Sequence, residues 1–161
     1  MTISVGDKMP EGTMMTMGDG GPQPVPTSEL FSGKKVVLFG LPGAFTPTCS
    51  AKHVPSYVQH ADDLKAKGVD TIACMSVNDP FVMGAWGKDQ SAGDKVMMLA
   101  DGSAEYTRKL GLELDLTARG MGVRATRFSI LVDDGTVRAV NIEENPGELA
   151  VSGADTIMGQ L

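Results

Sequence analysis

The middle of the chain, residues 35–77, has the sequence KVVLFGLPGAFTPTCSAKHVPSYVQHADDLKAKGVDTIACMSV. Its two ends, residues 35–41 (KVVLFGL) and 71–77 (TIACMSV), are almost continuously apolar. Such runs are typical of strands that are buried on both faces of a parallel or mixed sheet. We therefore expect both ends to be strands of a central sheet.

The segment between these two strands has the pattern of a helix. Pro47 disfavours helical geometry at Thr46, so the helix is expected to begin near Cys49. It should end near Ala66, and Pro55 in its second turn is expected to kink it. Apolar residues three or four apart form one stripe along it: Val54, Val58, Ala61 and Leu64. Strand, helix and strand together predict a right-handed βαβ unit.

Shorter signals extend this pattern in both directions. The turn cluster Asp19-Gly20-Gly21-Pro22 indicates a β-hairpin or an irregular segment within residues 1–30. Asp134-Gly135 is a strong hairpin signal, and Ser152 is a candidate helix cap. The other expected elements are a helical turn at 28–33, a helix at 81–90 capped by Asp79 with Pro80, a strand at 96–99, a helix at 103–110, a loop at 112–122, strands at 128–132 and 137–142, and a helix at 154–161.

This order of elements predicts an α/β fold with a mixed central sheet, helices on both faces, and a C-terminal β-hairpin plus helix. The thioredoxin-like fold fits it. The length of 161 residues is that of one domain, and the hydrophobic content of 42% is enough for a full core. We therefore expect residues 1–161 to form a single thioredoxin-like domain.

Composition excludes several classes of function. The formal net charge of -6 argues against nucleic-acid binding, which needs a basic surface. No apolar run approaches the roughly 20 residues that span a bilayer, so no membrane association is expected. No signal peptide is recognisable at the start of the chain, and two cysteines are too few for a disulfide framework. A cytoplasmic location is the default expectation.

Cys49 is the candidate catalytic residue. It lies at the predicted start of a helix, where free N–H groups and the helix dipole stabilise a thiolate. Thr46 precedes it by three residues, and Pro42 and Pro47 stiffen the loop. The alternative is an inert cysteine in the core, for which a loop of Pro and Gly is a poor place. The following residues do not make a C-x-x-C motif, so thioredoxin-like disulfide exchange and thioltransferase activity are disfavoured.

The segment Pro42–Cys49 has the form P-x-x-x-T-x-x-C, which resembles the peroxidatic-cysteine signature of the peroxiredoxins, and most closely that of the type II (peroxiredoxin 5) subfamily. Further blocks that are similar to this subfamily are Lys52–Pro55, Lys65–Val69, Cys74–Met83, Leu99–Ser103 and Arg127–Asp133. The resemblance thus covers essentially the whole chain.

The resemblance implies a role for each of four residues. Cys49 would attack the peroxide O–O bond and become a sulfenic acid. Thr46 would hold the peroxide by hydrogen bonding, Arg127 would bind it and stabilise both thiolate and transition state, and Pro42 would shield the sulfur. No cofactor and no metal are expected.

The residues alone leave some of these assignments open. A guanidinium suits a transition state in which charge appears on the leaving oxygen, but Arg124 rivals Arg127, and the resemblance favours Arg127. His53, four residues after Cys49, is either an auxiliary residue that polarises the site or a structural histidine. Phe45 is a candidate substrate contact, and four further residues could line an apolar approach for organic hydroperoxides or belong to the core: Leu112, Leu114, Leu116 and Met121.

Turnover needs a second thiol to reduce the sulfenic acid. No cysteine follows Cys74, and Cys74 lies in the middle of a predicted strand, so no resolving cysteine is assigned. We expect an external reductant: glutathione, glutaredoxin or thioredoxin. The resemblance also suggests a homodimer, for which Phe81, Met83 and Trp86 are candidate contacts, although their helical spacing fits a core equally well.

Two other functions compete with a peroxidase. Cys49, His53, His60 and Cys74 could bind a metal, but their spacing matches no standard zinc pattern. A redox sensor that uses Cys49 oxidation as a signal would have the same sequence, and only reductant-supported turnover would separate it from an enzyme.

Overall fold

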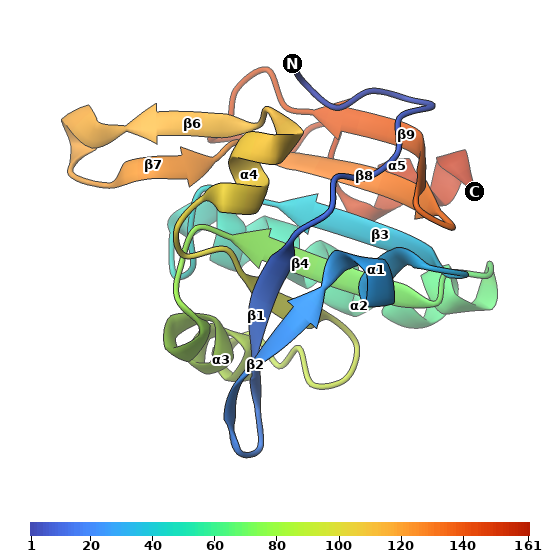
Figure 1. The fold of residues 1–161 in the computed structure, drawn as a ribbon, viewed down its shortest axis with the longest axis horizontal. Helices are drawn as coiled ribbons and strands as arrows, with labels where there is room; N and C mark the ends of the chain where they lie inside the picture. The colour runs from blue at the N-terminus through green and yellow to red at the C-terminus, as the bar shows by residue number, and fades with distance from the viewer.

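The computed structural model describes all residues, Met1–Leu161. Its centre is a seven-stranded sheet in the order β2-β1-β5-β4-β3-β8-β9. The strands β3 (Lys35–Gly40), β4 (Thr71–Ser76) and β5 (Met97–Ala100) are parallel, and the flanking strands pair antiparallel to them. The expected mixed sheet is therefore confirmed (Figure 1).

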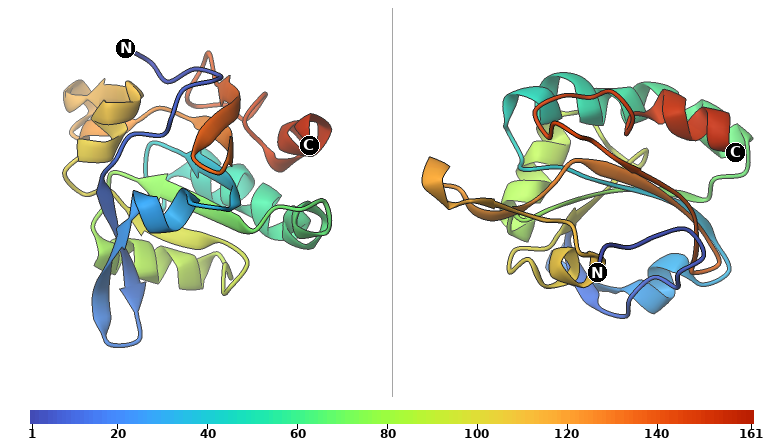
Figure 2. Two further views of the ribbon diagram at one scale, coloured as in Figure 1. Left: turned by 45° about the vertical axis from the view of Figure 1, so that its right-hand side comes forward. Right: turned by 90° about the horizontal axis from the view of Figure 1, so that it is seen from above.

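Helices cover both faces of this sheet, as the view from above in Figure 2 shows. One face packs against α2 (Val54–Ala66), α3 (Pro80–Asp89) and α5 (Ala154–Gln160), and the other against α1 (Thr27–Phe31) and α4 (Glu105–Leu110). Successive residues of a strand point to opposite faces of the sheet, so they belong alternately to two apolar clusters. Val37 and Phe39 belong to the first cluster, and Val36 and Leu38 belong to the second. This burial on both faces is why residues 35–41 are so apolar.

Two hairpins complete the sheet. At the N-terminus, β1 (Thr13–Gly18) and β2 (Gly21–Pro26) pair around the predicted turn cluster. At the C-terminus, β8 (Phe128–Asp133) and β9 (Thr136–Ile142) pair around Asp134-Gly135, followed by α5. The thioredoxin-like fold with its C-terminal hairpin and helix is thus confirmed.

Three local expectations need correction. Residues 112–122 are not a loop: β6 (Glu113–Leu116), a 3-10 turn (Thr117–Arg119) and β7 (Gly122–Ala125) form a separate hairpin that projects from the body. Apolar and acidic residues alternate in β6, which is the period of a strand. The kink expected at Pro55 is instead a π-helical turn at Cys49–His53, directly before α2. The wider turn accommodates the proline, whose ring would otherwise meet the carbonyl four residues earlier.

The third correction concerns the last helix. Gly153, not Ser152, is the cap of α5, because the Ser152 hydroxyl donates to the Glu143 carboxylate at 2.6 Å. The expected cap of α3 is confirmed, since the Asp79 side chain accepts a hydrogen bond from the N–H of Val82 at 2.8 Å.

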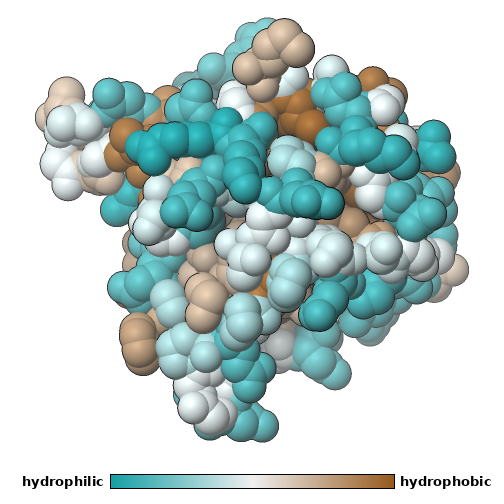
Figure 3. Space-filling model, in the orientation of Figure 1, coloured by the Kyte–Doolittle hydropathy of each residue, from teal (hydrophilic) through white to brown (hydrophobic).

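The outer surface agrees with the acidic composition. The face shown in Figure 3 is mostly hydrophilic, and its apolar patches are small and separate. No helix is both long enough and apolar enough to cross a membrane.

Candidate active site

The sulfur of Cys49 lies at the carboxyl end of β3, where the chain leaves the sheet through the loop 41–46 and enters a helix. The helical residues begin at Pro47, and the N–H of Ser50 donates to the Thr46 carbonyl at 3.0 Å. Cys49 is therefore in the first turn, as predicted. Its side chain has no exposed surface. The protein thus encloses the sulfur completely.

Arg127 is the side chain that reaches this sulfur. Its Nη2 donates a hydrogen bond to Sγ of Cys49 at 3.1 Å. Arg127 stands just before β8, the strand that pairs with β3, so the sheet brings residues 78 positions apart into contact. The guanidinium is buried, with 2% of its residue surface exposed. A permanent positive charge held against sulfur in an enclosed site favours negative charge on the sulfur.

The remaining nitrogens of Arg127 are also bound. Nε donates to the carbonyl of Pro146 at 2.9 Å, and Nη1 lies 2.9 Å from Nδ1 of His53. The rival Arg124 does not contact the sulfur: it donates to the carbonyls of Met121 and Pro42 at 2.8 and 3.2 Å. The preference for Arg127 over Arg124 therefore agrees with the geometry.

The hydrogen bonds of His53 determine its tautomer. Nε2 lies 3.0 Å from the Ser152 carbonyl, which can only accept, so Nε2 carries the proton. Nδ1 then keeps its lone pair and accepts from Arg127. Burial, together with the charge of Arg127, lowers the pKa of His53 from 6.5 to about 3, against the weaker effect of the Ser152 bond. His53 is thus a neutral acceptor that orients the guanidinium, and neither ring nitrogen is free for a metal.

The loop before Cys49 is held by its own hydrogen bonds. The Thr46 hydroxyl donates to the Gly43 carbonyl at 2.7 Å, so its proton is used and its lone pairs remain available. The N–H of Ala44 donates to Asn78 at 2.9 Å, and Pro42 is buried. Phe45 has a φ of 62°, in the left-handed region that a bulky residue rarely adopts. Its ring, 55% exposed, lies 6.4 Å from that of Trp86.

Cys74 does not take part in this cluster of hydrogen bonds. It is a free thiol, fully buried in β4, as its position in the strand predicts. Burial, and secondarily the charge of Cys49, raise the pKa of Cys74 well above its ordinary value, although Arg127 opposes this. A buried thiol that resists ionisation is a poor nucleophile.

The other candidate contacts divide between core and surface. Leu112, Met83 and Trp86 are buried core residues, whereas 66% of Phe81 is exposed. The remaining residues of the projecting hairpin that could line an approach are half-buried: Leu114, Leu116 and Met121.

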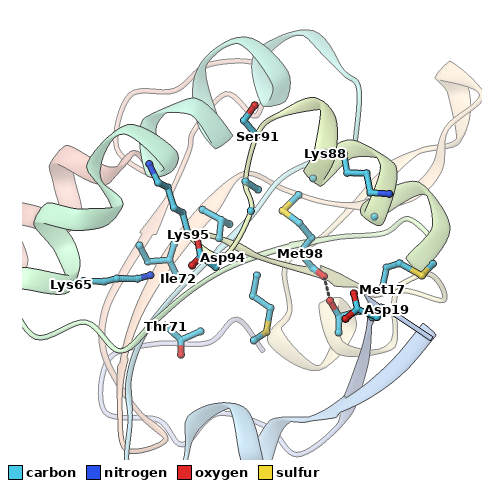
Figure 4. A pocket seen from close by; sticks show the side chains of 18 of the residues that line it. Met17, Asp19, Lys65, Thr71, Ile72, Lys88, Ser91, Asp94, Lys95 and Met98 are labelled. Atoms are coloured by element: carbon cyan, nitrogen blue, oxygen red, sulfur yellow. Dashed lines mark hydrogen bonds between the residues drawn. The ribbon is translucent and has the colours of Figure 1, made fainter. Parts of the chain in front are cut away.

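A cavity of about 900 Å³ lies elsewhere. It is formed between the amino ends of β4 and β5 and the end of α3 (Figure 4). Cys49 lies at the other end of these parallel strands. The charged lining of the cavity is balanced, with three lysines and three aspartates, and it contains no cysteine, histidine or arginine. This cavity is therefore separate from the surroundings of Cys49.

The chain matches the Redoxin family model over residues 4–158. It is 53% identical over 160 residues to peroxiredoxin-2B of Arabidopsis thaliana, which covers 99% of this chain and 98% of that protein. The chain belongs to the type II peroxiredoxins. It is therefore an oxidoreductase that reduces peroxides with the help of thiols.

Solved peroxiredoxin structures agree with this membership. Reduced Prx3 of Vibrio vulnificus in complex with hydrogen peroxide is 49% identical, with a TM-score of 0.93 over 98% of each chain. Peroxiredoxin 5 of Alvinella pompejana is 36% identical, with a TM-score of 0.86 over 98% of this chain and 97% of that one. The fold of this peroxiredoxin is thus that of its relatives along almost its entire length.

Proposed function

We propose that Cys49 is the thiol that attacks hydrogen peroxide and organic hydroperoxides. The observation that carries this assignment is the 3.1 Å hydrogen bond from Arg127 Nη2 to Sγ in an enclosed site. The thiolate attacks one peroxide oxygen, an S–O bond forms, and the O–O bond breaks. The departing oxygen takes a proton and leaves as water or an alcohol, and Cys49 becomes a sulfenic acid.

Arg127 serves this step in two ways. Before peroxide binds, its positively charged guanidinium lies against the sulfur. In the transition state, negative charge spreads to the departing oxygen, and fixed donors near that oxygen lower the barrier. Because Nε and Nη1 are tied to Pro146 and His53, Nη2 is held in place before peroxide arrives. Little reorganisation is then needed during the reaction.

Thr46 and Pro42 complete the proposed site. Since Thr46 already donates its proton to Gly43, it would bind peroxide by accepting the peroxide's O–H. Buried Pro42 limits the access of water to the sulfur, and exposed Phe45 is placed to contact the organic part of a larger hydroperoxide.

The reductant is an external thiol under this proposal: glutathione, glutaredoxin or thioredoxin. No cysteine follows Cys74, and Cys74 is buried with a raised pKa. The external thiol attacks the sulfenic sulfur, water leaves, and a second thiol reduces the resulting mixed disulfide. Because Cys49 has no exposed surface, the first turn of its helix must open before so large a molecule reaches it.

We also propose that the protein is a cytoplasmic homodimer. Phe45 and Phe81 are 55% and 66% exposed, which is unusual for phenylalanine and typical of an interface. The projecting hairpin β6–β7 pairs with no other strand. An isolated two-stranded hairpin is marginally stable in water, so contact with a second subunit would support it.

The test is peroxide turnover measured side by side with glutathione, glutathione plus glutaredoxin, and thioredoxin. Cys49→Ser should abolish peroxide consumption while the fold is retained, and Cys74→Ser should keep full turnover. A Cys49→Ser variant that still consumes peroxide contradicts the assignment. If Cys74→Ser stops turnover, the external-thiol cycle is wrong. If Cys49 is oxidised once and no reductant supports turnover, the protein is a sensor rather than an enzyme.

A further inference from the structure

The segment Glu143–Ser152, here called the strap, connects β9 to α5 and lies against the helix that carries Cys49. It contacts the site through its carbonyl oxygens. Pro146 accepts from Arg127 Nε at 2.9 Å, and Gly147 accepts from the Thr48 hydroxyl at 2.7 Å. The Ser152 carbonyl accepts from both His53 Nε2 and the Tyr57 hydroxyl, at 3.0 and 2.8 Å. The Pro146 carbonyl thus binds Arg127 directly, and the Ser152 carbonyl binds His53, which in turn binds Arg127.

The far end of the strap is fixed by one buried carboxylate. Glu143 is 5% exposed, and its side chain accepts hydrogen bonds from the N–H groups of Ala150, Val151 and Ser152 at 2.8–3.0 Å. It also accepts from the Ser152 hydroxyl at 2.6 Å. Burial by itself raises the pKa of Glu143, but the Ser152 hydroxyl and the three N–H groups outweigh it, and the pKa is lowered. All these donors require an acceptor that carries no proton.

Glu143 is also joined to Arg127 directly through the backbone, since its N–H donates to the Arg127 carbonyl at 3.0 Å. Two routes thus connect the same two residues. One is this backbone bond, and the other passes through the Ser152 carbonyl and His53 to Arg127 Nη1. A closed set of hydrogen bonds of this kind fixes an orientation more tightly than a single contact.

We propose that Glu143 is a positioning residue for the reaction of Cys49 with peroxide. Its carboxylate fixes the Ser152 carbonyl, this carbonyl keeps the proton of His53 on Nε2, and the lone pair on Nδ1 then aims Arg127 at Sγ. The inference rests on the role proposed above for Arg127. Glu143 itself touches neither the sulfur nor the place where peroxide binds.

The informative variant is Glu143→Gln, which keeps the shape of the side chain. Its amide has one acceptor oxygen and adds an NH₂ group that faces the N–H donors of the strap. The strap then shifts, and Arg127 loses its fixed direction. The matched control is Glu144→Gln, which makes the same change of charge at the neighbouring exposed position.

The measurement is a single turnover of the reduced protein with hydrogen peroxide, without any reductant, followed by the fluorescence of Trp86. We expect Glu143→Gln to slow this step by about tenfold or more, since a misplaced catalytic group can reduce a rate by up to about a hundredfold. The rate at which iodoacetamide alkylates Cys49 should fall in the same variant. Glu144→Gln should change neither rate.

A double-mutant cycle separates positioning from general stability. Arg127→Gln should slow the reaction strongly, and adding Glu143→Gln to it should slow it no further. If Glu143→Gln reduces the rate by the same factor in both backgrounds, or leaves it unchanged in the wild-type background, the inference is wrong. If Arg127→Gln reacts as fast as the wild type, the proposed function fails instead. Should Glu143→Gln not fold, Ser152→Ala replaces it, because it removes the hydroxyl donor but keeps the carbonyl; a smaller slowing is expected, and none would overturn the inference.

Discussion

Lowering the pH from 7 to 5 should remove about 2 kcal/mol of folding stability through His53 alone. The pKa of His53 is 6.5 in the unfolded chain and about 3 in the folded protein. Between these two values the unfolded state binds the extra proton and the folded state does not, so stability falls as the pH falls. Each pH unit below the unfolded value removes about 1.4 kcal/mol.

The assay is urea unfolding at both pH values, for the wild type and for His53→Gln. The glutamine cannot titrate, but its amide can still donate to Ser152 and accept from Arg127. All other titrating groups, including Glu143, are common to the two proteins and cancel in the comparison. The wild type should lose about 2 kcal/mol more than the variant between the two pH values. Parallel losses would show that His53 is not held neutral by burial and by Arg127, and would refute the reasoning.

Three further substitutions test separate parts of the structure. Arg127→Lys should slow the single turnover with peroxide by about tenfold to a hundredfold, because an ammonium on a flexible stem lacks the rigid, planar array of donors with which the guanidinium reaches Pro146, His53 and Cys49. An unchanged rate in stopped-flow mixing would contradict this. Tyr57→Phe should reduce the free energy of unfolding by about 1 kcal/mol, since the Ser152 carbonyl loses one of its two donors, and urea titration would measure it. Gly40→Ala should destabilise the fold by roughly 1–3 kcal/mol, because a Cβ at Gly40 would clash with the ring of Phe128; a stability equal to the wild type would show that the ring can move aside.

The local pattern of the chain was sufficient to predict most of the elements. Continuous apolar runs correspond to the buried strands β3 and β4, and Asp134-Gly135 corresponds to the hairpin turn. The sequence does not indicate the hairpin β6–β7, because the alternation in β6 covers only four residues and is mixed with helix-forming residues. The π-turn could not be foreseen, since Pro55 fits a kink equally well.

The residues of the site also differ in whether a local sequence pattern identifies them. Pro42, Thr46 and Cys49 lie within one short stretch of sequence, so a local motif identifies them. The choice of Arg127 over Arg124 needed family resemblance, because register and side-chain direction decide it. No local pattern points to Glu143, since its donors lie seven to nine residues further along the chain. A lone acidic residue after a strand gives no signal of what will fold onto it.

The π-turn at Cys49–His53 also sets the angular phase between the reactive residue and the rest of its helix. One residue occupies about 100° of an α-helix. The wider π-turn takes up about one residue more than an α-helical turn. If the same five residues were wound as a regular α-helix, everything upstream would swing around the helix axis by about that angle. The thiol would then face away from β8. The outer surface of α2 can thus vary freely in composition, whereas the π-helical winding of this one turn must be kept.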